Sequence, residues 1–166
     1  MGQEIERKFL VSDKIAMEYM DKVIKKELCC HNIEQAYLTT DPVIRIRKSD
    51  EEFYLTYKGK GLLSREEYNL PLTEEAYNTL KTKADGNVIA KTRILIPYQK
   101  YTIELDVFME PFEYIRMAEV EFDSIEEANS FVAPEWFIKE VTDDRYYHNS
   151  NMSRMSLEEI NMRRNA

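Results

Sequence analysis

The chain has 166 residues, which suits a single domain with a hydrophobic core of its own. Hydrophobic residues make up 43% and charged residues 33%, a composition that is typical of globular proteins and excludes a disordered chain. The net charge of -8 disfavours non-specific binding to nucleic acids, because such binding depends on an excess of positive charge near the phosphates.

The cysteines and the N-terminal segment predict a cytoplasmic protein. Cys29 and Cys30 are adjacent and cannot easily bridge each other, so no disulfide framework is expected. The N-terminal segment is charged, unlike a signal peptide, and no apolar run approaches the roughly 20 residues of a membrane span. His31 and His148 are far apart and lack metal-ligand spacing, so both are interpreted as surface or structural residues.

Strands outnumber helices among the predicted elements. Strands are predicted where apolar and polar residues alternate, and helices where a Ser or Thr can cap the first turn. In chain order the elements are a strand at 4–11, a helix from Ser12 to about Leu28, strands at 43–47, 53–58 and 65–72, a helix between Thr73 and Gly86, strands at 88–96, 101–108 and 114–122, a helix after Ser124, a strand at 137–142, and a short helix after Ser156. We therefore predict an α+β, mainly antiparallel β fold, a meander or barrel with helices packed outside.

Five predicted strands carry two charges of the same sign on one face, opposite an apolar face. Residues i and i+2 of a strand point to the same side, roughly 6.5–7 Å apart. Such like charges repel, so another group must compensate them. The acidic pairs are Glu4 with Glu6, Glu104 with Asp106, and Glu119 with Glu121, and the basic pairs are Arg45 with Arg47 and Lys91 with Arg93.

A complex of a divalent metal with a polyphosphate would compensate both kinds of pair. Carboxylates two residues apart are suitable ligands for Mg²⁺ or Mn²⁺. Paired arginines suit bidentate capture of phosphate oxygens. From the pattern alone, charged faces that simply meet solvent remain an equally good explanation. The sequence has neither a P-loop nor a dinucleotide-binding glycine motif, so those modes of phosphate capture are not predicted.

A series of short motifs, in order from Glu4 to Asn149, resembles the CYTH superfamily, the triphosphate tunnel metalloenzymes. The motifs are EIERKFLV, QAYLTTDPVIRIR, LTYKGKGLLSREEY, AKTRI, ELDVF, AEVEF and KEVTDDRYYHN. The resemblance implies an eight-stranded antiparallel barrel that forms a tunnel with a charged interior. It also implies one CYTH domain over 1–150, with 151–166 as a tail or short helix of the same domain.

The resemblance further implies a role for each charged position. Its triphosphate-binding bases match Lys8, Arg45, Arg47, Lys58, Lys91 and Arg93, and its metal-binding acids match Glu4, Glu6, Glu67, Asp106, Glu119 and Glu121. Glu4, Glu6 and Lys8 are expected to be catalytic. Asn69 stands where family members often carry a second glutamate, which puts the strength of one metal site in doubt.

The expected reaction is hydrolysis of inorganic triphosphate to pyrophosphate and phosphate, with water attacking the terminal phosphorus and Mg²⁺ or Mn²⁺ as cofactor. The alternatives are a class IV adenylyl cyclase, a thiamine triphosphatase, a non-catalytic polyphosphate- or nucleotide-binding module, and a carrier with an apolar barrel interior lined by Ile44, Leu55, Val107 and Val120. No nucleic-acid or membrane partner is expected, and the sequence leaves monomer and homodimer open.

Overall fold

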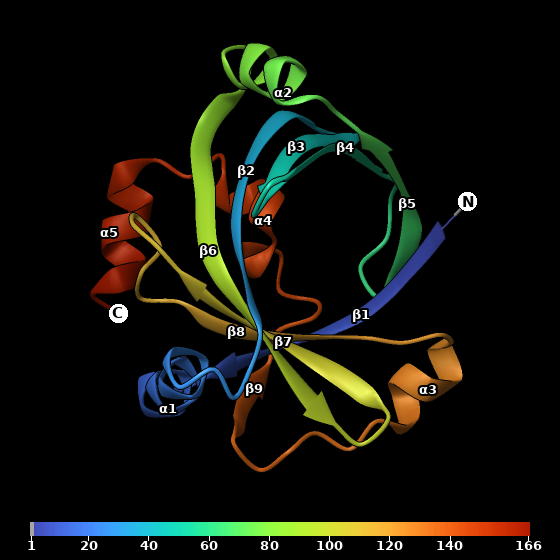
Figure 1. The fold of residues 1–166 in the computed structure, drawn as a ribbon, viewed down its shortest axis with the longest axis vertical. Coiled ribbons are helices and arrows are strands. Elements are labelled where there is room, and N and C mark those ends of the chain that lie inside the picture. The colour runs from blue at the N-terminus through green and yellow to red at the C-terminus, as the bar shows by residue number, and fades with distance from the viewer. Residues whose placement is uncertain (1) are drawn as a thin grey trace.

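The computed structural model describes residues 2–166, whose strands form one antiparallel sheet that closes on itself (Figure 1). The strands are β1 (Gly2–Val11), β2 (Cys30–Thr40), β3 (Val43–Ser49), β4 (Glu52–Lys58), β5 (Ser64–Pro71), β6 (Asp85–Tyr98), β7 (Tyr101–Phe108), β8 (Arg116–Glu121) and β9 (Phe137–Glu140). The helices are α1 (Asp13–Ile24), α2 (Glu74–Lys81), α3 (Ile125–Ser130), the 3₁₀ helix η1 (Arg145–Tyr147), α4 (Asn149–Met152) and α5 (Leu157–Arg164).

The first strand closes the barrel because it pairs on both of its edges. Its residues 2–5 pair with β5, and its residues 6–10 pair with β8. Within residues 2–166, eight strands thus form a ring in the order β1-β8-β7-β6-β2-β3-β4-β5 and back to β1. The predicted eight-stranded antiparallel barrel is confirmed.

One barrel strand was missing from the sequence prediction, and one predicted strand lies elsewhere. β2 was not predicted, because buried residues run consecutively from Gln35 to Tyr37 and the register shifts on both sides of the strand. Such shifts break the alternation by which strands are recognised. The segment predicted at 137–142 forms β9, which pairs with the end of β1 outside the ring.

The predicted caps begin the helices, whereas the helix ends differ. Ser12, Thr73, Ser124 and Ser156 each accept a hydrogen bond from a first-turn backbone N–H, and Ser156 with Glu159 forms a complete capping box. Helix α1 ends at Ile24, before Leu28. Gly86 does not follow the end of α2 directly but lies inside β6 at φ +80, where its backbone packs against Ser153.

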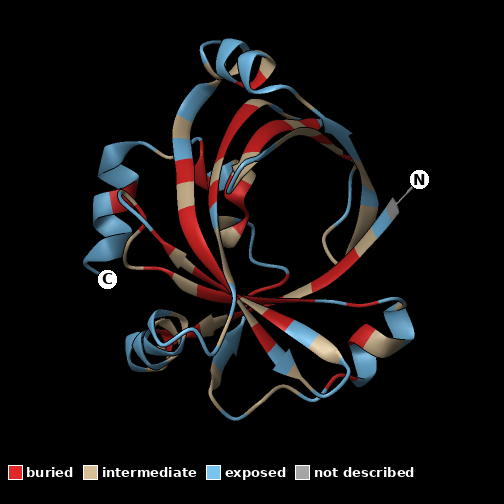
Figure 2. Ribbon diagram, viewed as in Figure 1, coloured by how far each residue is buried: buried red, intermediate tan, exposed pale blue. Residues whose placement is uncertain are grey.

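The hydrophobic core lies between the barrel wall and the surrounding helices. Clusters of buried apolar residues sit on the outer face of the strands, and helices α1, α2, α3 and α5 lie around the ring in Figure 1. Buried segments also run along the strands themselves in Figure 2, and many of them carry charged or polar side chains, including Arg45, Lys58 and Glu119. The barrel interior is therefore polar and the outer layer apolar, as the resemblance to the CYTH superfamily implied.

Two observations concern the chain outside the barrel. No helix within residues 2–166 has both the length and the apolar character needed to cross a membrane. The segment after Asn149 packs against the barrel, because Met152 and Ile160 are buried in one cluster with Phe112 and Met117.

Candidate functional site

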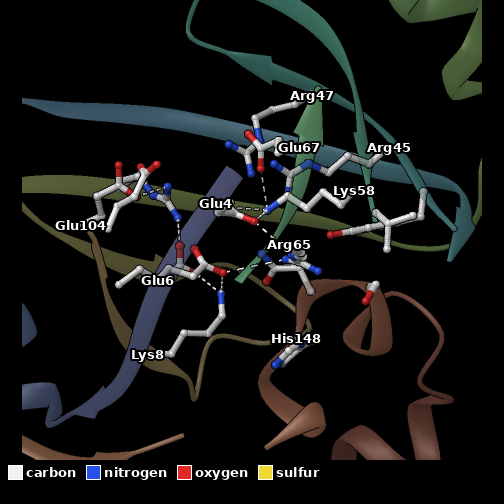
Figure 3. Close-up of a pocket in the computed structure, with 17 residues that line it drawn as sticks. Glu4, Glu6, Lys8, Arg45, Arg47, Lys58, Arg65, Glu67, Glu104 and His148 are labelled. Carbon is white, nitrogen blue, oxygen red and sulfur yellow. Dashed lines mark hydrogen bonds and ion pairs between the residues drawn. The ribbon is translucent and has the colours of Figure 1, made fainter. Parts of the chain in front are cut away.

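The barrel encloses a cavity of about 170 Å³ whose lining is mostly charged (Figure 3). Among the described residues, six bases and six acids line it: Lys8, Arg45, Arg47, Lys58, Arg65 and Arg93, with Glu4, Glu6, Glu67, Glu104, Glu119 and Glu121. Cross-strand register brings the acids and bases together, since Lys8 lies opposite Glu119 and Glu6 lies opposite Glu121.

Ten of the twelve predicted site residues line this cavity. The other two, Lys91 and Asp106, are completely buried and do not line it. The Asp106 carboxylate accepts hydrogen bonds from Lys91 Nζ and from Arg93 Nε at 2.7 Å and Nη2 at 2.8 Å. Asp106 thus links Lys91 to Arg93, and neither Lys91 nor Asp106 lies at the space where a ligand would bind.

The inward charges also exclude the carrier alternative. Arg45 and Glu119 are 5% and 6% exposed and face the cavity. A barrel that binds an apolar ligand needs an apolar lining, which this interior does not provide.

Lysine side chains in the cavity are held by pairs of carboxylates. Lys8 Nζ lies 2.7 Å from Glu6 Oε1 and 3.0 Å from Glu119 Oε1. Burial opposes the charge on Lys8, but Glu119 and Glu6 outweigh burial and raise the pKa of its ammonium group. Lys58 lies 2.6 Å from Glu4 and 3.0 Å from Glu67. Lys8 is therefore positioned to carry a positive charge inside the barrel, whereas burial, followed by the charge of Arg45, lowers the pKa of Lys58 despite its two carboxylate contacts.

Asn69 acts as a hydrogen-bond bridge in this structure. Its Oδ1 accepts from the Thr56 hydroxyl at 2.6 Å, and its Nδ2 donates to Glu67 Oε1 at 2.8 Å. Burial would raise the pKa of Glu67, but the Lys58 charge and the Asn69 hydrogen bond lower it to about 2. The amide thus helps to keep Glu67 ionised.

Two arginines of β3 are buried without an acidic partner. Arg47 donates from Nε and Nη2 to Gln35 Oε1, at 3.0 and 2.8 Å. The Arg45 Nε is buried and has no hydrogen-bond partner within residues 2–166. Burial, followed by the charges of Arg45 and Arg93, lowers the pKa of Arg47. This corner of the cavity thus holds two guanidinium groups that form no ion pair within residues 2–166, together with a free donor, which suits an anion with several oxygens.

The acidic side of the cavity has carboxylates that repel one another. Burial, followed by the charges of Glu104, Glu4, Glu6 and Glu67, raises the pKa of the Glu121 carboxyl. A hard divalent cation would relieve this repulsion, and carboxylate oxygens are the ligands that Mg²⁺ and Mn²⁺ prefer. Glu4, Glu6 and Glu121 therefore fit such an ion by their chemistry.

These carboxylates are not already arranged around a metal position. Within residues 2–166, no three Asp, Glu, His or Cys side chains converge in a way that would hold a metal ion. Glu4 and Glu6 instead contact the bases, since Glu4 accepts from Lys58 Nζ and from Arg65 Nε at 3.0 Å. Metal binding would require these side chains to exchange a base for the ion.

Several lining residues were not predicted as site residues. Arg65 lies in the SREEY motif, and Glu104 forms one of the acidic pairs with Asp106. Both sequence patterns could therefore have identified these residues as part of the site. Tyr37 lies on the unpredicted strand β2. His148, Asn149 and Ser150 reach the cavity from the junction of η1 and α4, which no local pattern indicates. His148 is therefore buried in the cavity wall, where its Nε2 lies 3.1 Å from the Thr142 carbonyl.

The chain is similar to known proteins over nearly its full length. The family model described as the CYTH domain matches residues 2–155. An inorganic triphosphatase of Nitrosomonas europaea is 36% identical over 155 residues, which cover 90% of this chain and 96% of the relative. An inorganic triphosphatase of Acetivibrio thermocellus is 32% identical over 154 residues, which cover 92% of this chain and 94% of the relative.

Solved structures agree with this similarity. A crystal structure of an inorganic triphosphatase aligns with a TM-score of 0.65 at 31% identity, covering 94% of this chain and 97% of its own. The PH1012 protein of Pyrococcus horikoshii aligns with a TM-score of 0.53 at 20% identity, covering 94% of this chain and 93% of its own. At that identity, the second likeness concerns the fold alone.

Proposed function

The chain belongs to the CYTH domain family, and from this premise we propose that it hydrolyses inorganic triphosphate to pyrophosphate and phosphate. The observation that carries the proposal is the pair of buried arginines without carboxylate partners, enclosed in one cavity with a set of repelling carboxylates. Two relatives that are 36% and 32% identical over most of the chain are inorganic triphosphatases.

The size and lining of the cavity favour a compact anion. Its volume of about 170 Å³ is small, and its walls are mostly charged. Pockets that enclose drug-sized organic ligands measure roughly 300–1,000 Å³ and are mostly apolar. Inorganic triphosphate therefore suits the cavity better than a ligand that carries a nucleoside or thiamine.

We assign the basic side of the cavity to the substrate. Arg45 and Arg47 would bind phosphate oxygens with little competition, because neither guanidinium forms an ion pair with a carboxylate within the described residues. Lys58 and Arg93 would exchange part of their carboxylate contacts for phosphate contacts. Phosphoryl transfer depends mainly on positioning and on stabilising charge, and these four cations supply both.

We assign the acidic side of the cavity to binding the metal cofactor and to accepting the proton of the attacking water. Glu4, Glu6 and Glu121 would hold Mg²⁺ or Mn²⁺, which neutralises phosphate charge and acidifies water when bound. The oxygen of the attacking water bonds to the terminal phosphorus as the bridging P–O bond breaks, and pyrophosphate leaves. A cavity carboxylate takes the proton of that water. Lys8 keeps its own proton, because Glu119 and Glu6 raise its pKa, and stabilises the charge on the transferred group.

We also infer that the protein works in the cytoplasm, as a monomer or a homodimer. Cys29 and Cys30 are free thiols, which suits a reducing compartment. Native mass spectrometry would distinguish the two oligomeric states.

The test is phosphate release from inorganic triphosphate, ATP, thiamine triphosphate and pyrophosphate, each with Mg²⁺, with Mn²⁺ and with chelator. We expect metal-dependent release from inorganic triphosphate that is lost in Glu4→Gln and Arg45→Ala. Lys48→Ala is the matched control, because Lys48 lies on the same strand as Arg45 but does not line the cavity. Formation of cyclic AMP from ATP would support the cyclase alternative instead, and tight triphosphate binding without turnover would support a binding module.

A further inference from the structure

One end of the barrel has a groove that adjoins the cavity. The groove measures about 630 Å³ and lies between the β2–β3 turn, the β4–β5 loop and the η1–α4 segment. We call it the basic vestibule, because Lys60, Arg65, Arg145 and Arg154 line it with Asp41 as the one acid among its described lining residues.

The basic vestibule and the cavity share part of their walls. Val43, Arg65, His148 and Ser150 line both spaces. Arg65 connects them directly, because its Nε donates to Glu4 inside the cavity at 3.0 Å. An anion in the vestibule would therefore lie beside the site that we propose for triphosphate.

The opposite end of the barrel has the opposite charge. Strand β4 runs from Glu52 at that end to Lys58 next to the vestibule loop. Two hollows adjoin the cavity there, and acids outnumber bases in both. Glu51, Glu52 and Glu67 line one together with Arg45 and Arg47, and Glu104, Glu121, Asp123 and Glu127 line the other together with Lys100. Helix α4 belongs to the vestibule end, because its Ser150 and Asn151 line the vestibule, and it contacts β2 and β6. In Figure 1 it is seen through the ring of strands. The two ends thus differ in electrostatic potential.

Three vestibule cations are not neutralised by neighbours. Lys60, Arg145 and Arg154 are exposed, and none forms an ion pair with a carboxylate within residues 2–166. Arg154 instead donates to the Thr40 hydroxyl at 3.0 Å. In a chain of net charge -8, unpaired cations gathered in one groove run against the overall composition. A cleft of one sign attracts and concentrates ligands of the other sign.

We propose that the basic vestibule is an outer binding site for condensed-phosphate anions, which captures triphosphate beside the cavity. This inference rests on the proposed triphosphatase function. The occupant must be a small polyanion, because the groove is concave and its cations converge from three separate segments. The acidic rims at the other end would repel the same anion.

The first test compares charge reversals that change the net charge equally. Lys60→Glu and Arg154→Glu alter the vestibule, and Lys100→Glu is the matched control, since Lys100 is an exposed cation at the acidic end. In low salt, we expect the vestibule variants to lower kcat/KM for triphosphate roughly three- to tenfold with kcat unchanged. The loss should disappear near 1 M salt, where charges are screened within about 3 Å. Equal effects of all three variants, or a parallel fall in kcat, would overturn the proposal.

The second test does not depend on turnover. Calorimetry with chelator present would follow triphosphate binding to Arg45→Ala, in which the cavity is weakened. We expect a residual weak site that disappears when Lys60→Glu or Arg154→Glu is added and persists with Lys100→Glu. If that residual binding is absent, or is unchanged by the vestibule variants, the vestibule is not an anion site. A wild-type protein that released no phosphate would contradict the proposed function, whereas this measurement would still decide the vestibule.

Discussion

Replacing Asp106 with Asn would remove the charge that holds two buried cations together. The Asp106 carboxylate is fully buried and contacts Lys91 Nζ and two nitrogens of Arg93. Asparagine keeps the shape of the side chain, but its amide nitrogen would face a cation. The change therefore tests electrostatic support of the cavity wall with little change in packing.

The size of the expected loss follows from these contacts. Removing one partner of a buried ion pair costs about 3–5 kcal/mol of unfolding free energy. Arg93 keeps Glu119, which lies 2.8 Å from its Nη2, and also keeps Glu104. Burial, together with the charge of Arg93, already lowers the pKa of Lys91 to about 8, so Lys91 can lose its proton in the variant. We therefore expect the low end, about 3 kcal/mol, or a fall in Tm of roughly 6–12 °C for a domain of this size.

Urea denaturation and thermal unfolding of the wild type, Asp106→Asn and Glu104→Gln measure this loss. Glu104 also contacts Arg93, but its side chain is 33% exposed, so its removal should cost at most about 1 kcal/mol. A loss for Asp106→Asn that is below about 1 kcal/mol, or no larger than that for Glu104→Gln, would refute the reasoning. Mg²⁺ adds a second readout: a ligand that binds the folded state raises Tm, and a smaller rise in Asp106→Asn would mean that Asp106 binds the metal after all.

Four further predictions follow from the cavity and the outer core. Arg47→Ala should weaken triphosphate binding roughly 10- to 100-fold in calorimetry, because it removes a buried cationic donor; an equal effect of Lys48→Ala would contradict this. Glu121→Gln should raise the Kd for Mg²⁺ by roughly an order of magnitude in a metal titration, because it removes a proposed metal ligand. An unchanged Kd would show that Glu121 does not bind the metal. The pKa of Lys91 in the folded state, about 8, lies below its ordinary value of 10.5, so the unfolded chain binds more protons between these pH values. Unfolding free energy should thus gain a rising contribution between pH 8 and 10.5, which disappears in Lys91→Met; identical pH slopes would argue against it. Ile160→Ala should cost about 2–5 kcal/mol in urea denaturation, since Ile160 is buried in the outer core, and a loss near zero would show that α5 is not part of the domain.

Local sequence signals were sufficient where chemistry and geometry both act within a few residues. A strand repeats every two residues, so Arg45 and Arg47 had to share a face whatever the rest of the chain does. Caps act within one turn, so Ser12, Thr73 and Ser156 mark helix starts in both the prediction and the structure. These signals predicted the charged faces, the four capped helices α1, α2, α3 and α5, and the fold class, but not η1 or α4.

The alternation of polar and apolar residues did not predict which inward-facing side chains line the cavity. Lys91 and Arg93 share one face of β6, yet Arg93 lines the cavity while Lys91 is buried and does not line it. Alternation specifies the side of the sheet on which a residue lies. It does not specify how far along the barrel axis a ligand would reach.

By itself, the sequence determined that alternating strands would place acids and bases on one face and apolar residues on the other. Tertiary structure alone decided that this charged face points inward, because β1 pairs with both β5 and β8 and closes the ring. Closure also brought in the irregular strand β2, whose register shifts hide it from local analysis, and it placed His148 and Asn149 against the cavity. The β1–β8 pairs join residues more than a hundred positions apart. The free energy that selects such pairs comes from packing the helices on the outer face, which no short window of sequence contains.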